Sequence, residues 1–162
     1  EEIERKMPDY NAAMGRQLDA IIGQYPVEAL PGSLELVQAL SQRDDVALGI
    51  VTGNVSSTAP IKLLAAGFDP AWFPVGAFGH EAMARDHLPA LALARAVERY
   101  RYPFTPEEVM VIGDTPADVS CARALGAVVV GVETGFCEPG ELAAAKPDYL
   151  LRDLTEFSRV FA

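Results

Sequence analysis

A short apolar stretch that ends in a turn constrains the fold of this chain more than any other feature. Residues 109–112 are Val-Met-Val-Ile, and Gly113 and Asp114 follow at once. An apolar run of this length, closed by turn residues, is typical of a buried strand in a parallel sheet. In open sheets of this kind, the loops at the carboxyl ends of the strands form the ligand crevice. Asp114 is therefore predicted to lie at the edge of the sheet where ligands bind.

Strands and helices alternate along the rest of the chain, which indicates an α/β fold with a mostly parallel sheet and right-handed crossovers. Strands are expected at 46–51, near 75–77, and at 109–112, 127–132 and 149–151. Helices are expected at 1–24 with an interruption near Pro8, and at 33–42, 57–66, 88–100, 116–125, 141–145 and 154–161. The strand at 46–51 is continuously apolar, so we expect it to be buried on both faces.

Asp114 and Asp118 form a candidate metal site. If Pro116 begins a helix, Asp118 lies in its first turn and can face the same crevice as Asp114. Two converging carboxylates suit a hard cation, above all Mg²⁺, which keeps several waters and is held by few carboxylates. In the alternative interpretation, Asp114 only caps the helix that starts at Pro116.

A candidate phosphate site follows from two further loops. Thr52, Gly53 and Asn54 come at the end of the first strand and offer a hydroxyl, an unhindered backbone N–H and an amide just before a helix. Arg85 lies in the stretch after the short strand near 75–77, where a guanidinium could neutralise a bound phosphoryl group with two parallel hydrogen bonds. The alternatives are an ordinary polar turn at 52–54 and a solvated surface arginine at 85.

Composition narrows the class of partner. The formal net charge of −10 argues against nucleic acid and against an anionic membrane surface, although a bound metal and one cation can still make a cleft attractive to a small phosphorylated metabolite. The longest apolar runs are far too short to span a bilayer, and no basic segment followed by an apolar one opens the chain. Cys121 and Cys137 form no CxxC pattern and are interpreted as idle thiols. We therefore expect a cytoplasmic protein.

The motifs, taken in order, resemble those of the haloacid dehalogenase superfamily, which consists mostly of Mg²⁺-dependent phosphatases, and more closely those of its phosphoglycolate phosphatase-like branch. The resemblance extends from about Leu30 to the end of the chain. It is carried by Leu30-Pro31-Gly32, residues 49–54, Lys62-Leu63, Ala66-Gly67-Phe68, Arg85 with Leu88-Pro89, residues 111–118, residues 121–127 and residues 132–135.

The resemblance implies a fold and an organisation. The fold would be a three-layer, doubly wound and mostly parallel sheet of the Rossmann-like type. Residues 1–25 would be the remnant of a helical cap, and residues 26–162 would be the core without its first strand.

The resemblance also implies roles for the site residues. Thr52 would hold the phosphoryl group through its hydroxyl, supported by the backbone N–H groups of Gly53 and Asn54. Arg85 stands where the family more often has lysine, which keeps the charge but changes the geometry.

At the metal, the resemblance assigns Mg²⁺ to Asp114, and Asp118 would assist directly or through a water molecule.

One part of the family pattern is missing from the sequence. The family uses an aspartate nucleophile, which forms an aspartyl-phosphate, and a second aspartate two residues later as general acid and base; both lie in a DxDxT-type motif after the first strand. No such motif occurs here. Aspartates elsewhere do not take its place, since they precede a strand, lie in the opening helix or follow no strand directly (Asp44, Asp45, Asp148, Asp9, Asp19, Asp69 and Asp86).

In the family, the missing strand is central and lies between the strands that end at Thr52 and Asp114. Without its apolar side chains and ladder hydrogen bonds, an independent monomer is expected to be only marginally stable. We therefore expect the chain to be the carboxyl-terminal part of a longer protein. If it is complete, it would need a homo-oligomer or a strand supplied by another chain.

The leading hypothesis is a phosphatase of small phosphate monoesters, active only with the missing segment. A second is an inactive binding or regulatory module that keeps the phosphate and metal sites. A third is a dehalogenase or phosphomutase of the same superfamily. A nucleotide-binding Rossmann domain is disfavoured because no GxGxxG motif follows any strand.

Overall fold

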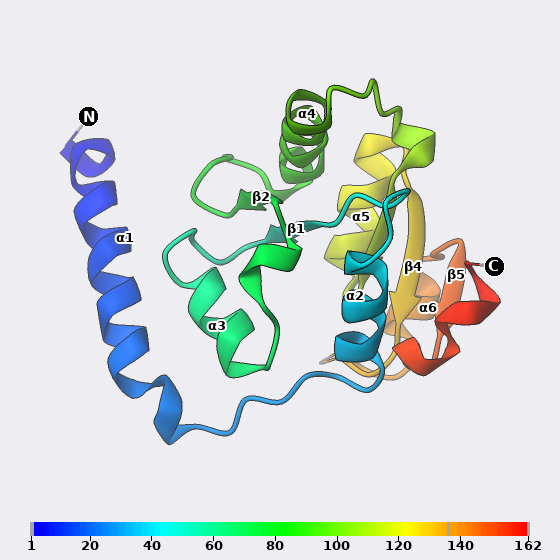
Figure 1. Cartoon of the computed structure of the whole chain (residues 1–162), viewed down its shortest axis with the longest axis horizontal. Coiled ribbons are helices and arrows are strands. Elements are labelled where there is room, and N and C mark those ends of the chain that lie inside the picture. The colour runs from blue at the N-terminus through cyan, green and yellow to red at the C-terminus, as the bar shows by residue number, and fades with distance from the viewer. Residues whose placement is uncertain (1, 136, 162) are drawn as a thin grey trace.

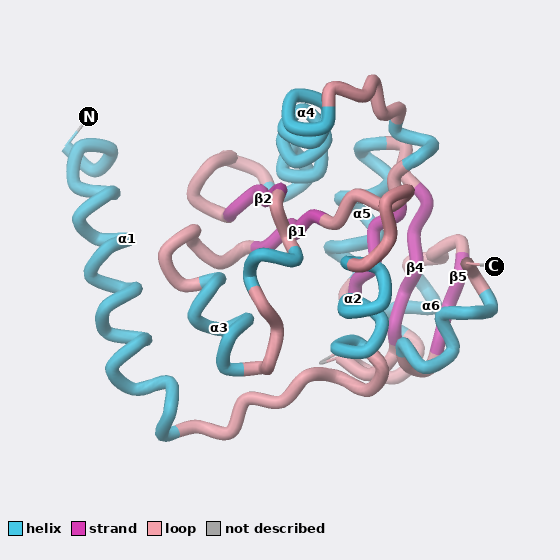
Figure 2. Tube along the Cα trace, in the orientation of Figure 1, coloured by secondary structure: helices cyan, strands magenta, loops and turns pink. Residues whose placement is uncertain are grey.

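Five short parallel strands form the centre of the structure (Figures 1 and 2). The structure is a computed structural model and describes residues 2–135 and 137–161. The strands are β1 (Gly49–Thr52), β2 (Val75–Phe78), β3 (Met110–Gly113), β4 (Val128–Val132) and β5 (Tyr149–Leu151). Every described strand pair is parallel, so the expected α/β fold with parallel strands is confirmed.

The first strand is shorter than the sequence predicted. β1 begins at Gly49 and not at Val46, because Gly49 is the residue that pairs with Val75, where its partner β2 begins. A strand is defined by its ladder of hydrogen bonds, so apolar residues without a partner strand do not extend it.

The strands form two sheets and not one. β1 pairs with β2, and β3 pairs with β4, which pairs with β5. Within the described part of the chain, β1 and β3 are therefore each hydrogen-bonded on one side only. This division corrects the expectation of burial for these two strands: no residue of β1 is buried, and Ile112 of β3 is 38% exposed. Only β4, which has a neighbour on each side, is buried along most of its length.

The helices are found where the apolar spacing predicted them. They are α1 (Glu2–Ile21), α2 (Ser33–Ser41), α3 (Ala59–Ala65), α4 (Leu88–Tyr100), α5 (Pro116–Leu125) and α6 (Glu141–Ala144). Gly126 ends α5 in the left-handed conformation with φ of 84°, which glycine adopts without a steric penalty.

Two helical predictions were wrong. Pro8 does not interrupt α1, which continues through it. Proline removes a single N–H donor, and here the helical turns on both sides remain in place. The last helix is a 3-10 helix at Leu154–Arg159, begun by the Asp153 side chain, which accepts a hydrogen bond from the Thr155 backbone N–H. A segment of six residues suits the tighter 3-10 winding, which occurs mostly in short pieces.

Helices cover both faces of the larger sheet, which makes this half of the molecule a three-layer structure. On one face, side chains of α5 and α6 pack against alternate residues of the strands in a cluster of Val119, Ala122, Ala127, Val129 and Leu142. On the other face, α2 and the 3-10 helix pack in a cluster of Val130, Val132, Leu151 and Phe157 with Leu36. Successive residues of β4 contribute to opposite clusters, as the period of two in a strand requires.

The smaller sheet is joined to the larger one through α4, which packs on β1 and β2 and also contacts α5. Helix α1 lies at the outside of the molecule next to α3 (Figure 1). The Ser57 hydroxyl donates a hydrogen bond of 2.6 Å to the backbone carbonyl of Asn11 and ties α1 to the loop before α3. None of the helices in the described residues has the length and apolar character needed to cross a bilayer.

The buried start of α4 gives a first testable prediction. Leu88 is 1% exposed, whereas Leu64 on α3 is 62% exposed. We expect Leu88→Ala to lower the free energy of unfolding by about 2–5 kcal/mol, because it removes buried methyl groups and leaves a cavity. The matched control Leu64→Ala should change it by no more than about 0.5 kcal/mol. Urea denaturation of both variants checks this, and equal losses would contradict the packing described.

Candidate functional site

Thr115 and Asp118 close the first turn of α5 and so shape the loop that carries Asp114. Thr115 is the N-cap residue, and its hydroxyl accepts the backbone N–H of Asp118 at 3.3 Å. In return, Asp118 Oδ2 accepts the backbone N–H groups of Asp114 and Thr115 at 3.1 and 3.0 Å. This reciprocal capping box satisfies donors that a helix start leaves free. The cap of α5 is therefore Thr115, and the alternative that Asp114 caps the helix is wrong.

Arg85 forms an ion pair with the second carboxylate oxygen of Asp118. Arg85 begins a one-turn 3-10 helix at Arg85–His87, and one of its terminal nitrogens lies 2.5 Å from Asp118 Oδ1. The Arg85 side chain is 43% exposed and that of Asp118 is 17% exposed. This ion pair connects the loop after β2 to the helix after β3, so it joins the two sheets at their carboxyl ends. Arg85 thus lies at the predicted edge of the sheet.

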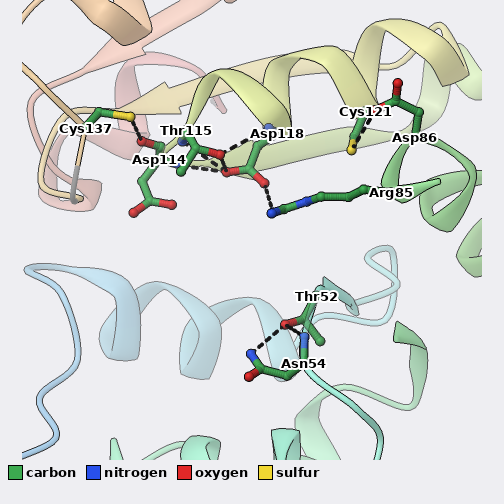
Figure 3. Close-up of polar contacts among 9 residues, drawn as sticks. All are labelled: Thr52, Asn54, Arg85, Asp86, Asp114, Thr115, Asp118, Cys121 and Cys137. Carbon is green, nitrogen blue, oxygen red and sulfur yellow. Dashed lines mark hydrogen bonds and ion pairs between the residues drawn. The ribbon is translucent and has the colours of Figure 1, made fainter. Parts of the chain in front are cut away.

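The carboxylate of Asp114 is the unengaged acidic group of the site. Among the described residues it accepts no hydrogen bond, and Figure 3 shows it pointing away from α5 into the space that separates it from Thr52. Gly135, in the loop after β4, packs so closely that a Cβ atom there would lie 1.9 Å from Asp114 Oδ2. The Cys137 thiol donates to the backbone carbonyl of Asp114 at 2.9 Å.

The donor set tests the metal hypothesis. Asp114 offers free carboxylate oxygens, and hard oxygen donors are what Mg²⁺ prefers. Both oxygens of Asp118 already accept hydrogen bonds, so its oxygens are less available than the sequence suggested. The described residues contain no group of three acidic, histidine or cysteine side chains that could hold a metal. These side chains therefore fit a cation held by few carboxylates, and not one enclosed by protein.

Thr52 and Asn54 form a compact polar turn on the opposite side of the site (Figure 3). The Thr52 hydroxyl oxygen accepts hydrogen bonds from the backbone N–H of Asn54 at 3.1 Å and from its side-chain amide at 2.9 Å. Lys62 of α3 donates to the Asn54 amide oxygen at 2.7 Å. The Gly79 N–H donates to the Asn54 carbonyl at 2.9 Å, which fastens this turn to the end of β2.

A second ion pair holds the loop that leads to Arg85, and sequence reasoning missed it. Glu81 accepts two hydrogen bonds from Arg95 of α4, at 2.7 and 2.9 Å, and also accepts the backbone N–H of Phe78. Arg95 donates further to the Gly76 carbonyl at 2.6 Å. The Arg95 guanidinium, and after it the Phe78 N–H, lower the pKa of Glu81 below its usual value. Glu81 lies in a loop and Arg95 in the helix that follows, and only the fold brings the two side chains together. The sequence therefore gives no local signal for this ion pair.

The two cysteines are free, as expected, and neither suits nucleophilic chemistry. Burial, and after it a hydrogen bond to Asp86, raises the pKa of Cys121 to about 11. Burial also raises the pKa of Cys137. Both thiols are therefore protonated at neutral pH, whereas the thiolate is the reactive form.

Comparison with known proteins finds one matching family and two curated relatives. Residues 87–157 match the HAD-hydrolase-like family, a range that includes Asp114 and Asp118. The chain is 31% identical over 127 residues to a phosphoglycolate phosphatase of Synechococcus elongatus, covering 77% of this chain and 55% of the relative. It is 26% identical over 129 residues to a phosphoglycolate phosphatase of Haemophilus influenzae, covering 78% of this chain and 54% of the relative. The chain thus spans about half the length of these curated relatives.

A solved structure shares the fold. CbbY from Rhodobacter sphaeroides, determined in complex with phosphate, superposes with a TM-score of 0.71 at 21% identity, over 93% of this chain and 65% of that one. At 21% identity this likeness shows a shared fold. The family match and the two curated relatives support the haloacid dehalogenase-like hydrolase superfamily, and within it the phosphoglycolate phosphatase-like branch.

The Asp118 carboxylate is hydrogen-bonded in the described structure and the Asp114 carboxylate is not, and this difference generates a prediction. Asp118→Ala should lower the free energy of unfolding by about 1 kcal/mol, because it removes half of the capping box of α5. Asp114→Ala should change it by no more than about 0.5 kcal/mol, since no described residue hydrogen-bonds to that carboxylate. Thermal unfolding of both variants without metal checks this, and a larger loss for Asp114→Ala would contradict the assignment of the cap.

The Arg95–Glu81 pair generates a prediction about pH. Because the folded-state pKa of Glu81 is lowered, its stabilising effect is complete above its ordinary pKa of about 4.5 and is lost as the pH falls through the folded-state value. Glu81→Gln should therefore be less stable than the wild type at pH 7, and the difference should shrink below about pH 4.5.

Chemical denaturation at several pH values measures this difference. Glu98→Gln is the matched control, since Glu98 is exposed on the same helix as Arg95 and its side chain makes no hydrogen bond to another described residue. A difference for Glu81→Gln that is constant with pH would contradict the ion pair.

Proposed function

We propose that this chain forms the phosphate- and metal-binding part of a Mg²⁺-dependent phosphatase that hydrolyses small phosphate monoesters. The observation that carries the proposal is the grouping at one edge of the strands: the Thr52 hydroxyl at the end of β1, Arg85 after β2 and the free carboxylate of Asp114 after β3. A hydroxyl donor, a cation and an unengaged carboxylate together suit a phosphoryl dianion with its counter-ion. The phosphatase names of the curated relatives support this chemistry.

Each residue has a distinct task in this proposal. Thr52 donates its hydroxyl hydrogen to a phosphoryl oxygen, and the Gly53 N–H lies in the same turn. The Asn54 backbone N–H, which the resemblance also implied, already donates to the Thr52 hydroxyl oxygen. Arg85 neutralises charge on the phosphoryl group, for which it must share or release Asp118. Asp114 would hold Mg²⁺, and Asp118 would assist, either as a direct ligand or through a water molecule. When bound, the metal supplies positive charge that stabilises the phosphoryl group in the transition state.

The nucleophile is proposed to come from a strand outside the 162 residues. The open edges of β1 and β3 would pair with one further strand, and the relatives are nearly twice as long as the part that the chain matches. An aspartate at the carboxyl end of that strand attacks phosphorus as the ester P–O bond breaks, and a second aspartate protonates the departing alcohol. Water then attacks the aspartyl-phosphate, which releases inorganic phosphate and restores the carboxylate. A cap built around α1 and a cytoplasmic location stay predictions.

A phosphatase assay with Mg²⁺ tests the proposal on two proteins: the chain of 162 residues, and the same chain extended at its amino end by an apolar strand that ends in Asp-x-Asp. Hydrolysis by the extended protein alone supports it. Binding of phosphate or Mg²⁺ without hydrolysis by either protein would favour an inactive binding module. Strong dependence of the hydrolysis on Mg²⁺ would exclude the dehalogenase branch.

Asp114 provides the matching mutational prediction in the active, extended protein. Asp114→Asn should lower kcat at least about a hundredfold, because it removes the carboxylate that holds the cation and thereby several kcal/mol of transition-state stabilisation. Asp44→Asn serves as the control, since Asp44 is exposed and precedes β1, at the opposite end of the sheet. Similar kcat values for both variants would contradict a metal role for Asp114.

A further inference from the structure

Thr52 can bind a phosphoryl group only if its hydroxyl hydrogen is free to be donated. A phosphoryl dianion offers only acceptor oxygens, whereas a hydroxyl has one hydrogen and two acceptor positions. Which of these faces the ligand depends on the neighbours of Thr52. In this structure, the deciding neighbour is a lysine that does not touch Thr52 itself.

Lys62 determines which way the Asn54 amide faces. An ammonium group has donors and no acceptor, so the atom of Asn54 that lies 2.7 Å from Lys62 Nζ must be the amide oxygen. The amide nitrogen then faces Thr52 and donates to Oγ1 at 2.9 Å. The reverse orientation would place the amide N–H groups against the ammonium donors, which leaves both without an acceptor.

The orientation of Asn54 in turn decides the role of the Thr52 hydroxyl. Its oxygen accepts from the Asn54 side chain and also from the Asn54 backbone N–H at 3.1 Å, so both of its acceptor positions are taken. The hydroxyl hydrogen must point elsewhere, and no described residue accepts it. The backbone of the turn cannot readily rearrange, since the Gly79 N–H holds the Asn54 carbonyl at 2.9 Å.

We infer that Lys62 is a positioning residue which, through Asn54, leaves Thr52 as an obligatory hydrogen-bond donor toward the phosphoryl group. The inference rests on the proposed function for the identity of the ligand, but the relay from Lys62 to Asn54 and Thr52 is a property of the free protein. The relay makes the site selective for ligands that only accept hydrogen bonds at this point.

The relay is tested first without ligand. In the ¹⁵N–¹H spectrum of the wild type, Thr52→Val should shift the side-chain amide resonances of Asn54, because it removes their acceptor. Lys62→Glu replaces a donor by an acceptor, so the amide should turn toward Glu, and adding Thr52→Val should then shift these resonances much less. Lys62→Arg keeps a donor and should retain the wild-type response. Equal shifts in the Lys62→Glu and wild-type backgrounds would overturn the inference.

The consequence for binding is tested with inorganic phosphate in a double-mutant cycle. Lys62→Glu should weaken phosphate binding about tenfold more when Thr52 is present than in the Thr52→Val background, as expected for one hydrogen bond to a charged group. The Thr52→Val background measures the purely electrostatic effect of the charge reversal. Lys62→Arg should bind within about twofold of the wild type.

The two hypotheses can fail separately. If Lys62→Glu weakens phosphate binding equally with and without the Thr52 hydroxyl, Lys62 acts only through its charge and the inference is wrong. If the wild type binds no phosphate although the spectra show the relay, the proposed function is contradicted while the orientation of Asn54 and Thr52 by Lys62 is supported.

Discussion

Parallel pairing of the strands is the constraint on which the remaining features depend. Parallel strands end at the same edge, so the ends of β1 and β2 lie side by side in one sheet, and the Arg85–Asp118 ion pair connects this edge to the helix that follows β3. β1 ends in Thr52 itself, whereas Arg85 and Asp114 lie in the segments that follow β2 and β3.

Local hydrogen bonds then determine what each turn presents. The capping box of α5 engages Asp118 and leaves the carboxylate of Asp114 unengaged. On the other side, Lys62 engages the Asn54 amide and leaves the Thr52 hydroxyl hydrogen unengaged. In both places a neighbour takes up the competing hydrogen bonds, so that one group stays available for a ligand. The link between the two sides is the Arg85–Asp118 ion pair together with the packing of α4 on α5.

The sequence was sufficient to predict most of the elements and to predict that Thr52 and Asp114 come at the carboxyl ends of strands, because apolar runs and turn residues are local signals. The sequence did not predict that β1 and β3 would be partly exposed at the division between the two sheets. The apolar pattern of Ile112 is the same whether or not a neighbouring strand covers it, and the structure leaves it 38% exposed. The local pattern did not rank Asp114 against Asp118, and only the family resemblance gave Asp114 the leading role at the metal. Both are aspartates near a helix start, and only the geometry shows that Asp118 is the one held by the backbone.

The partners of Arg95 and Lys62 were beyond sequence reasoning for a related reason. Each interaction joins a helix to a loop eight or more residues earlier, and nothing in the intervening residues marks the pair. At Pro8 a local signal in the sequence proved wrong. Proline usually breaks a helix, yet α1 continues through Pro8 from Glu2 to Ile21.

The close packing of Gly135 against Asp114 allows the position of the Asp114 carboxylate to be changed without removing its charge. Any side chain at position 135 would collide with the carboxylate, since even a Cβ atom would lie 1.9 Å from it. Alanine at this position would thus displace the acidic group and keep its charge. The loop after β4 therefore limits the positions open to the Asp114 carboxylate. Glycine is required at position 135 because the carboxylate fills the space that a larger residue would need.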